Sequence, residues 1–425
     1  MSRRDLLVRW FPTESPAGRY GWRPVIVMSA LFFSIGFVTW LNGPLITFVQ
    51  VAFSLSDVAA FLVPACFYLS YLVFPLPATL LSRRTGLRKG LIIALCIMAA
   101  GTALFGECIT VRSYAGALTG LGVLGAGLTL LQITINPYVS LLGAPDRAAQ
   151  RIAIMGVSNK FAGILAPVLF AFLVMPDVGN VASGLKNTPP GPEREALISA
   201  FTGAVHGPYM IMALLLLVLA LFVSRARLPE LDIGSTEVSL NVTSSGWLLS
   251  GVFAMFLYVG VEVLAGDAIG SFGHALGLPL DTAKYLTAVT LAAMMAGYIA
   301  GMIAVPRFIA GEHCFLVSCT AGIILCILTL LLPGTLPVLC VALLGFANAM
   351  IMPTLFPFVL QAAGEKGSRI TALLVMAFSG GAVLPQIYIH VTQFCGARLA
   401  FSALAVPAYL FMAGWMIAFR KMRAA

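Results

Sequence analysis

Two carboxamide side chains lie within an apolar stretch near the first third of the chain. The segment 127–138 contains Gln132 and Asn136, which are four residues apart and therefore share one face of a helix. A carboxamide both donates and accepts hydrogen bonds, so a pair of them suits the hydroxyl groups of a sugar. The same pair could instead join two helices inside a membrane. We predict that both residues bind a polar substrate.

Further amide and aromatic residues in apolar segments are candidates for the same site. Polar side chains are costly in hydrocarbon, so they usually face a cavity or a partner. The predicted substrate-binding residues are Trp40, Asn42, Gln132, Asn136, Asn159, Tyr258, Asn348 and Gln386. Trp40 offers a flat face on which a sugar ring could stack, although its place in the outer half of its segment is also typical of an interfacial anchor.

Two acids in one apolar segment are candidates for cation coupling. Glu262 and Asp267 are five residues apart, hence about 140° apart on an ideal helix. They can face one cavity only if the helix is irregular, which Gly260 and Gly266 would allow. A buried carboxyl group can carry a proton. We expect Glu262 to be the coupling group and Asp267 to be the second candidate. A structural hydrogen bond for Glu262 and a solvated external position for Asp267 are the alternatives.

Two basic side chains in apolar segments have open roles. Lys160 needs a carboxylate or several carbonyl partners, unless its ammonium group reaches the nearer membrane surface. His390 suits either a structural position or a proton relay.

Catalytic chemistry is not indicated. The sequence contains no HExxH motif, no paired carboxylates and no nucleophile constellation, so we predict that the protein is not an enzyme. The eight cysteines form no C-x-x-C motif and no Cys/His pair at metal-ligand spacing. We therefore expect no metal site and no cofactor, apart from a coupling ion, H⁺ or Na⁺.

The composition places these residues in a membrane. The chain has 425 residues, of which 60% are hydrophobic and 10% charged, and its mean hydropathy is +0.99. A soluble domain has about 25% charged residues, so too little polar surface remains for one. The net charge of +9 arises from basic residues in short connections, and we expect no nucleic-acid partner. Long continuous apolar runs also exclude a β-barrel.

Twelve apolar segments are long enough to cross a bilayer. The predicted spans are 24–50, 58–81, 90–110, 115–142, 152–175, 207–224, 246–270, 283–305, 314–332, 336–362, 370–394 and 399–418. Lys and Arg concentrate in the connections on the side of the amino terminus, which predicts that both termini are cytoplasmic. A polar external loop is expected at 176–206.

The spans divide into two sets of six. We predict an amino-terminal half at 1–224, a cytoplasmic linker at 225–245 and a carboxy-terminal half at 246–425. This layout is typical of the major facilitator fold, in which two pseudo-symmetric halves rock around a site at mid-membrane. The fold class is thus an all-α membrane protein with twelve transmembrane helices.

Four motifs together resemble one transporter family. They are Phe37–Gly43 (FVTWLNG), the QxxxNPYV motif that begins at Gln132, the pair Asn159-Lys160, and Tyr258–Glu262 (YVGVE). This set resembles the fucose–galactose–glucose permease family of the major facilitator superfamily, and most closely its bacterial glucose/galactose and N-acetylglucosamine branch. The resemblance covers nearly the whole chain. It implies cation-coupled sugar uptake across a bacterial inner membrane by a monomer surrounded by membrane lipid.

The sequence departs from the family pattern at two positions. Members similar to the fucose/proton symporter carry an Asp after the Leu-Asn pair of span 1 and a Glu four residues before the Asn-Pro of span 4. Gly43 and Gln132 occupy these positions here. The coupling mechanism of those members therefore cannot be transferred, and L-fucose is disfavoured as cargo.

The function predicted from the sequence is secondary active import by alternating access. The substrate is a hexose or N-acetylhexosamine, namely N-acetylglucosamine, glucose or galactose, taken up by symport with a proton. Sodium-coupled or uncoupled sugar transport remains the alternative, followed by efflux of hydrophobic compounds. A membrane-embedded enzyme or a receptor is the remaining class, and no motif supports it.

Overall fold

The structure is a computed structural model that describes residues 22–142, 148–226, 228, 245–305, 307–363 and 367–424. Within these ranges the secondary structure is helical, and no strand occurs. The same ranges hold eleven helices that are long and apolar enough to span a membrane, or twelve if the bent pair Asp57–Val73 and Pro75–Ser82 is one span. The prediction of an all-α fold with up to twelve spans is confirmed.

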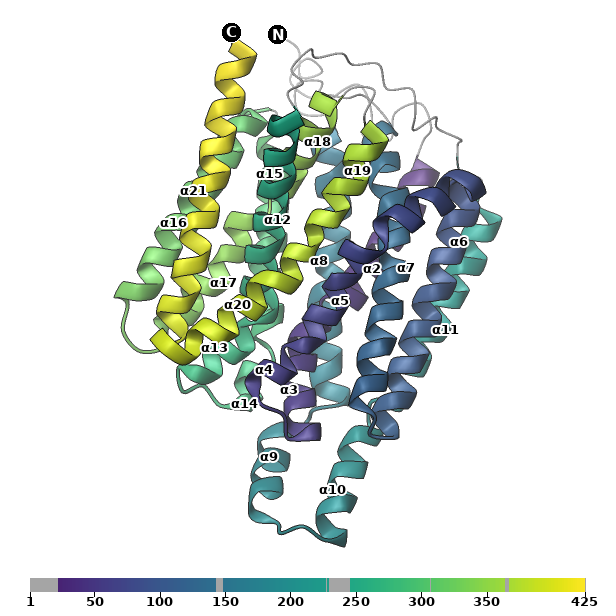
Figure 1. The fold of residues 1–425 in the computed structure, drawn as a ribbon, viewed down its shortest axis with the longest axis vertical. Helices are drawn as coiled ribbons and strands as arrows, with labels where there is room; N and C mark the ends of the chain where they lie inside the picture. Colours follow the sequence, from purple (N-terminus) through teal and green to yellow (C-terminus); the bar gives the residue numbers. More distant parts are fainter. Residues whose placement is uncertain are drawn as a thin grey trace, which may run out of the picture.

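The helices pack as two bundles that lie side by side (Figure 1). The first bundle, with two helices that project from its end, contains α2 (Trp22–Thr39), α3 (Asn42–Phe53), α4 (Asp57–Ala60), α5 (Leu62–Val73), α6 (Pro75–Thr110), α7 (Tyr114–Leu141), α8 (Ala148–Leu173), α9 (Val178–Asn187), α10 (Pro192–Gly203) and α11 (His206–Arg225). The second contains α12 (Ser245–Asp267), α13 (Ile269–Ala275), α14 (Leu280–Ala283), α15 (Leu286–Ala304), α16 (Gly311–Leu331), α17 (Leu336–Asn348), α18 (Ile351–Ala363), α19 (Gly367–Met376), the 3₁₀ turn η4 (Ala377–Ser379), α20 (Gly380–Cys395) and α21 (Ala397–Ala424).

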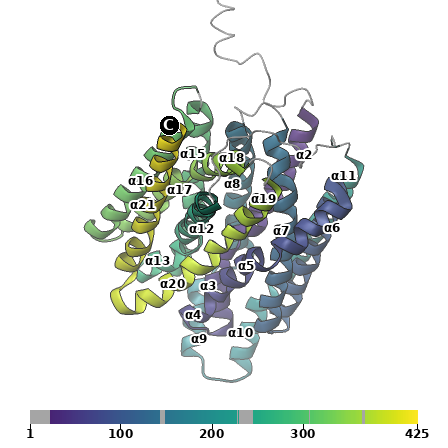
Figure 2. The same ribbon diagram turned by 45° about the horizontal axis from the view of Figure 1, so that its top comes forward.

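Two helix pairs form the main contact between the bundles. Helix α8 packs against α15, and α5 packs against α20 (Figure 2). The predicted linker at 225–245 lies almost entirely outside the described residues, so its bounds stay a prediction.

Proline residues coincide with breaks in two spans. The first span is interrupted between α2 and α3, and Pro44 lies in the first turn of α3. The tenth span is interrupted between α17 and α18, and Pro353 lies in the first turn of α18. Proline lacks an N–H group, which costs no bond in the first turn of a helix. Both breaks are buried among protein side chains, where irregular backbone is tolerated in a membrane.

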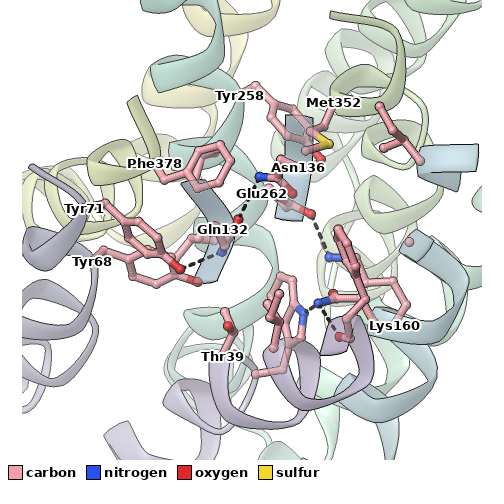
Figure 3. A pocket seen from close by; sticks show the side chains of 18 of the residues that line it. Thr39, Tyr68, Tyr71, Gln132, Asn136, Lys160, Tyr258, Glu262, Met352 and Phe378 are labelled. Atoms are coloured by element: carbon pink, nitrogen blue, oxygen red, sulfur yellow. Dashed lines mark hydrogen bonds and ion pairs between the residues drawn. The ribbon is translucent and has the colours of Figure 1, made fainter. Parts of the chain in front are cut away.

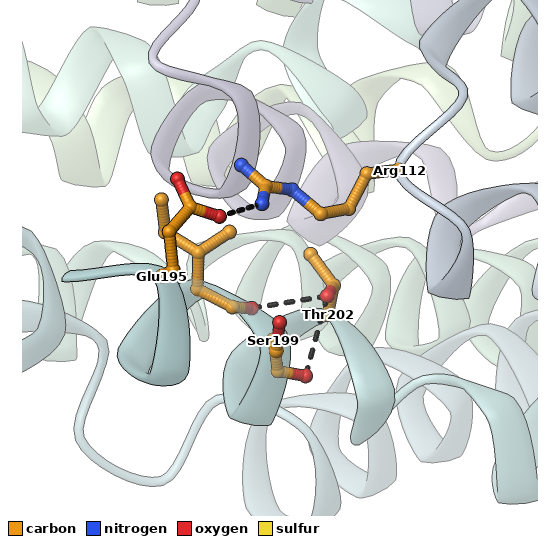
Figure 4. A network of polar contacts seen from close by, with 5 residues as sticks. Arg112, Glu195, Ser199 and Thr202 are labelled. Atoms are coloured by element: carbon orange, nitrogen blue, oxygen red, sulfur yellow. Dashed lines mark hydrogen bonds and ion pairs between the residues drawn. The ribbon is translucent and has the colours of Figure 1, made fainter. Parts of the chain in front are cut away.

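The predicted external loop at 176–206 forms two helices, α9 and α10, which project from one end of the bundles (Figure 1). Val178 and Leu185 are seven residues apart on α9, share one face and are buried. On α10, Glu195 forms an ion pair with Arg112 in the connection between α6 and α7 (Figure 4). The polar composition of this segment favoured the prediction of a loop over the two helices that it forms.

A buried lysine joins the two bundles at the end where α9 and α14 lie. Lys284, which is 4% exposed, follows α14 in the second bundle. Its ammonium group donates to the carbonyl oxygens of Met175 at 2.7 Å and Pro176 at 2.9 Å, just beyond α8 in the first bundle. It also pairs with Asp281 at 2.9 Å. All three N–H bonds of the ammonium group therefore have acceptors.

Candidate functional site

A cavity of about 110 Å³ lies between the two bundles, near the middle of their helices (Figure 3). The predicted site residues that line it are Trp40, Gln132, Asn136, Asn159, Tyr258 and Glu262. They come from α7, α8, α12 and the break between α2 and α3. The fold thus brings residues that are far apart in the sequence around one polar space. Their roles in binding and coupling stay predictions.

The two amides of α7 share one face, as their spacing predicts. Gln132 donates from Nε2 to the hydroxyl oxygen of Tyr71 at 2.7 Å. Asn136 donates from Nδ2 to Oε1 of Gln132 at 3.4 Å. This chain of hydrogen bonds fixes the orientation of both amides along the cavity wall. The amides therefore face the protein interior, although Gln132 also joins α7 to α5.

A buried ion pair crosses the cavity between the bundles. Lys160 on α8 lies 2.9 Å from the carboxylate of Glu262 on α12. The side chains are 6% and 12% exposed, respectively. The carboxylate partner that Lys160 requires is thus present, and the alternative that its ammonium group reaches the membrane surface is wrong. The same contact is a structural hydrogen bond between the bundles, so it agrees with the alternative for Glu262, and the coupling role stays a prediction.

Trp40 lies beside this pair in the break of the first span. Its indole Nε1 donates to Oδ1 of Asn159 at 3.2 Å, and the ammonium nitrogen of Lys160 lies 4.1 Å from its ring centroid. The residue is 3% exposed, so the alternative of an interfacial anchor is wrong. A Cβ atom at Gly163 or Gly266 would come within 2.5 Å or 2.4 Å of the ring. Stacking of a sugar on the face next to Lys160 would require that side chain to move.

Other predicted site residues do not line this cavity, namely Asn42, Asp267, Asn348 and Gln386. Asn348 is fully buried and accepts a hydrogen bond from the hydroxyl of Tyr409 at 2.6 Å, which joins α17 to α21. The backbone carbonyl of Gln386 lies 2.7 Å from Nδ1 of His390, one turn along α20. The Asn348 bond joins two helices, whereas the amide nitrogen Nε2 of Gln386 has no hydrogen-bond partner among the described residues.

Asn42 and Asp267 are each 1% exposed. The alternative that Asp267 is solvated is therefore wrong. Nδ2 of Asn42 has no hydrogen-bond partner among the described residues, whereas the backbone N–H of Gly43 faces the carboxylate of Asp267. Glu262 lines the cavity and Asp267 does not, which agrees with their angular separation on a regular α12. Next to Asn42, a Cβ atom at Gly43 would come within 2.4 Å of Oγ1 of Thr287, so this position leaves no room for an acid.

Several lining residues were not predicted from the sequence. They are Thr39, Tyr68, Tyr71, Tyr298, Met352 and Phe378. Tyr68 and Tyr71 carry hydroxyl groups at i, i+3 spacing in an apolar span, which is a signal that a search for amides and charges overlooks.

The cavity offers amide, phenol and charged groups beside apolar walls. This combination suits a small polyhydroxylated solute, whose hydroxyl groups need hydrogen bonds and whose C–H groups need apolar contact. Among the described residues, no group of three or more His, Cys, Asp or Glu side chains could hold a metal ion.

Comparisons with known proteins agree with this architecture. The family model of the Major Facilitator Superfamily matches residues 27–385. The glucose/galactose transporter of Brucella abortus biovar 1 (strain 9-941) is 30% identical over 381 residues, which cover 88% of this chain and 89% of the relative. The L-fucose-proton symporter of Escherichia coli K12 is 25% identical over 391 residues, which cover 88% and 87%.

A solved structure has the same fold. The crystal structure of the transporter FucP in the outward conformation superposes with a TM-score of 0.76 at 22% identity, and covers 93% of this chain and 98% of that chain. The family match spans most of the sequence, and the Brucella relative is similar over nearly its full length. The chain is therefore a multi-pass membrane transporter of the Major Facilitator Superfamily, in the family of the glucose/galactose transporters and L-fucose-proton symporters.

Proposed function

We propose that this transporter imports a hexose or N-acetylhexosamine, with glucose, galactose and N-acetylglucosamine as the main candidates, by proton-coupled symport. The relatives are named for glucose, galactose and L-fucose, and the L-fucose relatives are named as proton symporters. The membrane is a bacterial inner membrane with both termini in the cytoplasm. The substrate crosses unchanged by alternating access, in which the two bundles rock around the cavity.

The observation that carries this proposal is the polar cavity between the bundles. Gln132 and Asn136 supply donors and acceptors that are already oriented, which lowers the entropic cost of binding a hydroxylated ligand. Phe378 and Met352 supply apolar surface on the side of the second bundle. A charge pair and several amides disfavour a hydrophobic cargo, so efflux of hydrophobic compounds is not supported.

The ion pair supports a proton as the coupling ion. When Glu262 accepts a proton it loses its charge, and the ion pair becomes a weaker hydrogen bond between the Lys160 ammonium group and a neutral carboxyl group. Protonation therefore weakens a contact between the bundles at the place where sugar binds. Sodium coupling would instead require a carboxylate that is free of Lys160, and Asp267 is the remaining candidate for that role.

Uptake by purified protein in liposomes tests the proposal. We expect an imposed inward proton gradient, but not a sodium gradient, to drive accumulation of one of the three sugars. The substitution Glu262→Gln should abolish gradient-driven accumulation and leave exchange of sugar for sugar intact. Glu193→Gln, at an exposed position on α10, is the control and should leave both activities unchanged. The proposal of a coupling role fails if the Glu262 variant still accumulates sugar with the proton gradient.

A further inference from the structure

A second hollow with a basic rim shares no lining residue with the sugar cavity. It measures about 400 Å³ and is lined by residues from the start of α2 and the end of α11. Arg23 and Arg225 flank it from these two helices. Both side chains are exposed, and neither has an ion-pair partner among the described residues.

The wall of this hollow is apolar and faces outward. Ile26 is 59% exposed and Phe222 is 50% exposed, and both line the hollow beside the two arginines. In a membrane such exposed side chains contact acyl chains. No carboxylate occurs among the described residues that line the hollow. It therefore combines two exposed positive charges with a surface that is complementary to hydrocarbon.

Topology alone explains basic residues at a helix end, but it does not explain a hollow between two of them. Arginine presents a planar fork of N–H donors that matches the oxygens of a phosphate group. Basic pockets between transmembrane helices commonly bind anionic lipid headgroups. We propose that Arg23 and Arg225 bind the phosphate of an anionic phospholipid, and that one acyl chain lies along Ile26 and Phe222.

This site has a structural consequence for the first bundle. Helices α2 and α11 contact each other over only a few residues. A lipid that is held by both arginines would bridge the first and last helices of the bundle at the end where the predicted linker begins. A lipid that binds the folded protein but not the unfolded chain raises the apparent stability of the protein by mass action.

Titration of purified protein with lipid tests the site. Dissociation constants for phosphatidylglycerol and phosphatidylcholine with the same acyl chains are measured by native mass spectrometry, and melting temperatures are recorded in parallel. We expect phosphatidylglycerol to bind at least about fivefold more tightly, since each basic residue near an anionic surface contributes about 1 kcal/mol. The double substitution Arg23→Gln/Arg225→Gln should remove this preference.

The matched control is Arg88→Gln, which removes an exposed arginine elsewhere in the first bundle and should retain the preference. Equal binding of the two lipids by the unmodified protein would overturn the proposal, as would an undiminished preference in the double variant. Inorganic phosphate tests the headgroup alone. If phosphate stabilises the protein as much as phosphatidylglycerol does, the ligand is a free anion and the lipid assignment is wrong. Sugar transport is not the readout, so failure here leaves the proposed function untouched.

Discussion

The ammonium nitrogen of Lys160 lies 2.9 Å from the carboxylate of Glu262, and the two residues belong to different bundles. The same nitrogen lies 4.1 Å from the ring centroid of Trp40. A buried charge pair is costly to desolvate, and it is most costly to leave half of it unpaired. Such a pair therefore adds little to the free energy of folding. A change of charge on either partner, however, alters the attraction between the two bundles.

Removal of one partner should be worse than removal of both. We predict that Lys160→Met destabilises the protein by about 3 kcal/mol, because the carboxylate of Glu262 is left buried without a counter-charge. The double variant Lys160→Met/Glu262→Gln should recover part of this loss. The melting temperature of the purified single and double variants provides the measurement. Purely additive losses would show that the two charges do not interact.

Two amides in the membrane spans, Gln132 and Asn348, should respond differently to substitution by alanine. Gln132 lines the sugar cavity, so Gln132→Ala should raise the KM for sugar uptake about tenfold, as expected for a lost hydrogen bond of about 1.4 kcal/mol. Asn348 accepts from Tyr409 outside the cavity, so Asn348→Ala should lower the melting temperature and leave KM nearly unchanged. Kinetics and thermal denaturation of the two variants separate these outcomes. An unchanged KM for the Gln132 variant would remove this residue from the binding site.

The sequence predicted which site residues share a face of one helix. It did not predict which residues from different helices form a pair. The separation of Gln132 and Asn136 is four residues, so helix geometry alone places them on one face. Lys160 and Glu262 are 102 residues apart, and only the arrangement of the two bundles brings their side chains together. The sequence indicated that Lys160 needs a carboxylate, but two acids on α12 were available.

The amide of Asn348 shows the same limit of prediction from sequence. The cost of burying Asn348 in an apolar segment predicts that it has a partner. It does not predict whether that partner is a substrate or, as the structure shows, the hydroxyl of Tyr409. The direction in which a polar group points depends on how its helix is rotated against its neighbours, and this rotation is set by side chains throughout the bundle.

The space around Trp40 should tolerate no added methyl group. A Cβ atom at Gly266 would come within 2.4 Å of the Trp40 ring, so Gly266→Ala should destabilise the protein by about 1–3 kcal/mol through overpacking. At Gly122 on α7, a Cβ atom would meet no heavy atom within 4 Å. Gly122→Ala should therefore be neutral or slightly stabilising, because alanine favours the helix. Thermal denaturation distinguishes the two. Equal melting temperatures would mean that Trp40 can shift without cost.

The contacts of Lys284 predict a barrier to opening at the end of the bundles where α9 and α14 lie. Its ammonium group bonds the carbonyl oxygens of Met175 and Pro176 across the boundary between the bundles. Lys284→Met removes both bonds, so separation of the bundles at this end should become more frequent. Lys186→Met, at an exposed position on α9, removes a positive charge nearby without removing these bonds and is the matched control.

A cysteine in the cavity reports this opening. Thr39 lines the cavity and its hydroxyl oxygen has no hydrogen-bond partner among the described residues, so Thr39→Cys sacrifices no bond seen there. In cells that carry this reporter, with Cys108 and Cys395 replaced by serine, a membrane-impermeant thiol reagent should reach residue 39 only when the end where α9 and α14 lie, which is the predicted external end, opens. We expect Lys284→Met to increase the labelling rate about threefold or more, in line with the loss of at least one hydrogen bond of about 0.7 kcal/mol. If labelling is equally fast in the Lys284 and Lys186 variants, the bonds to Met175 and Pro176 do not hold this end of the bundles closed.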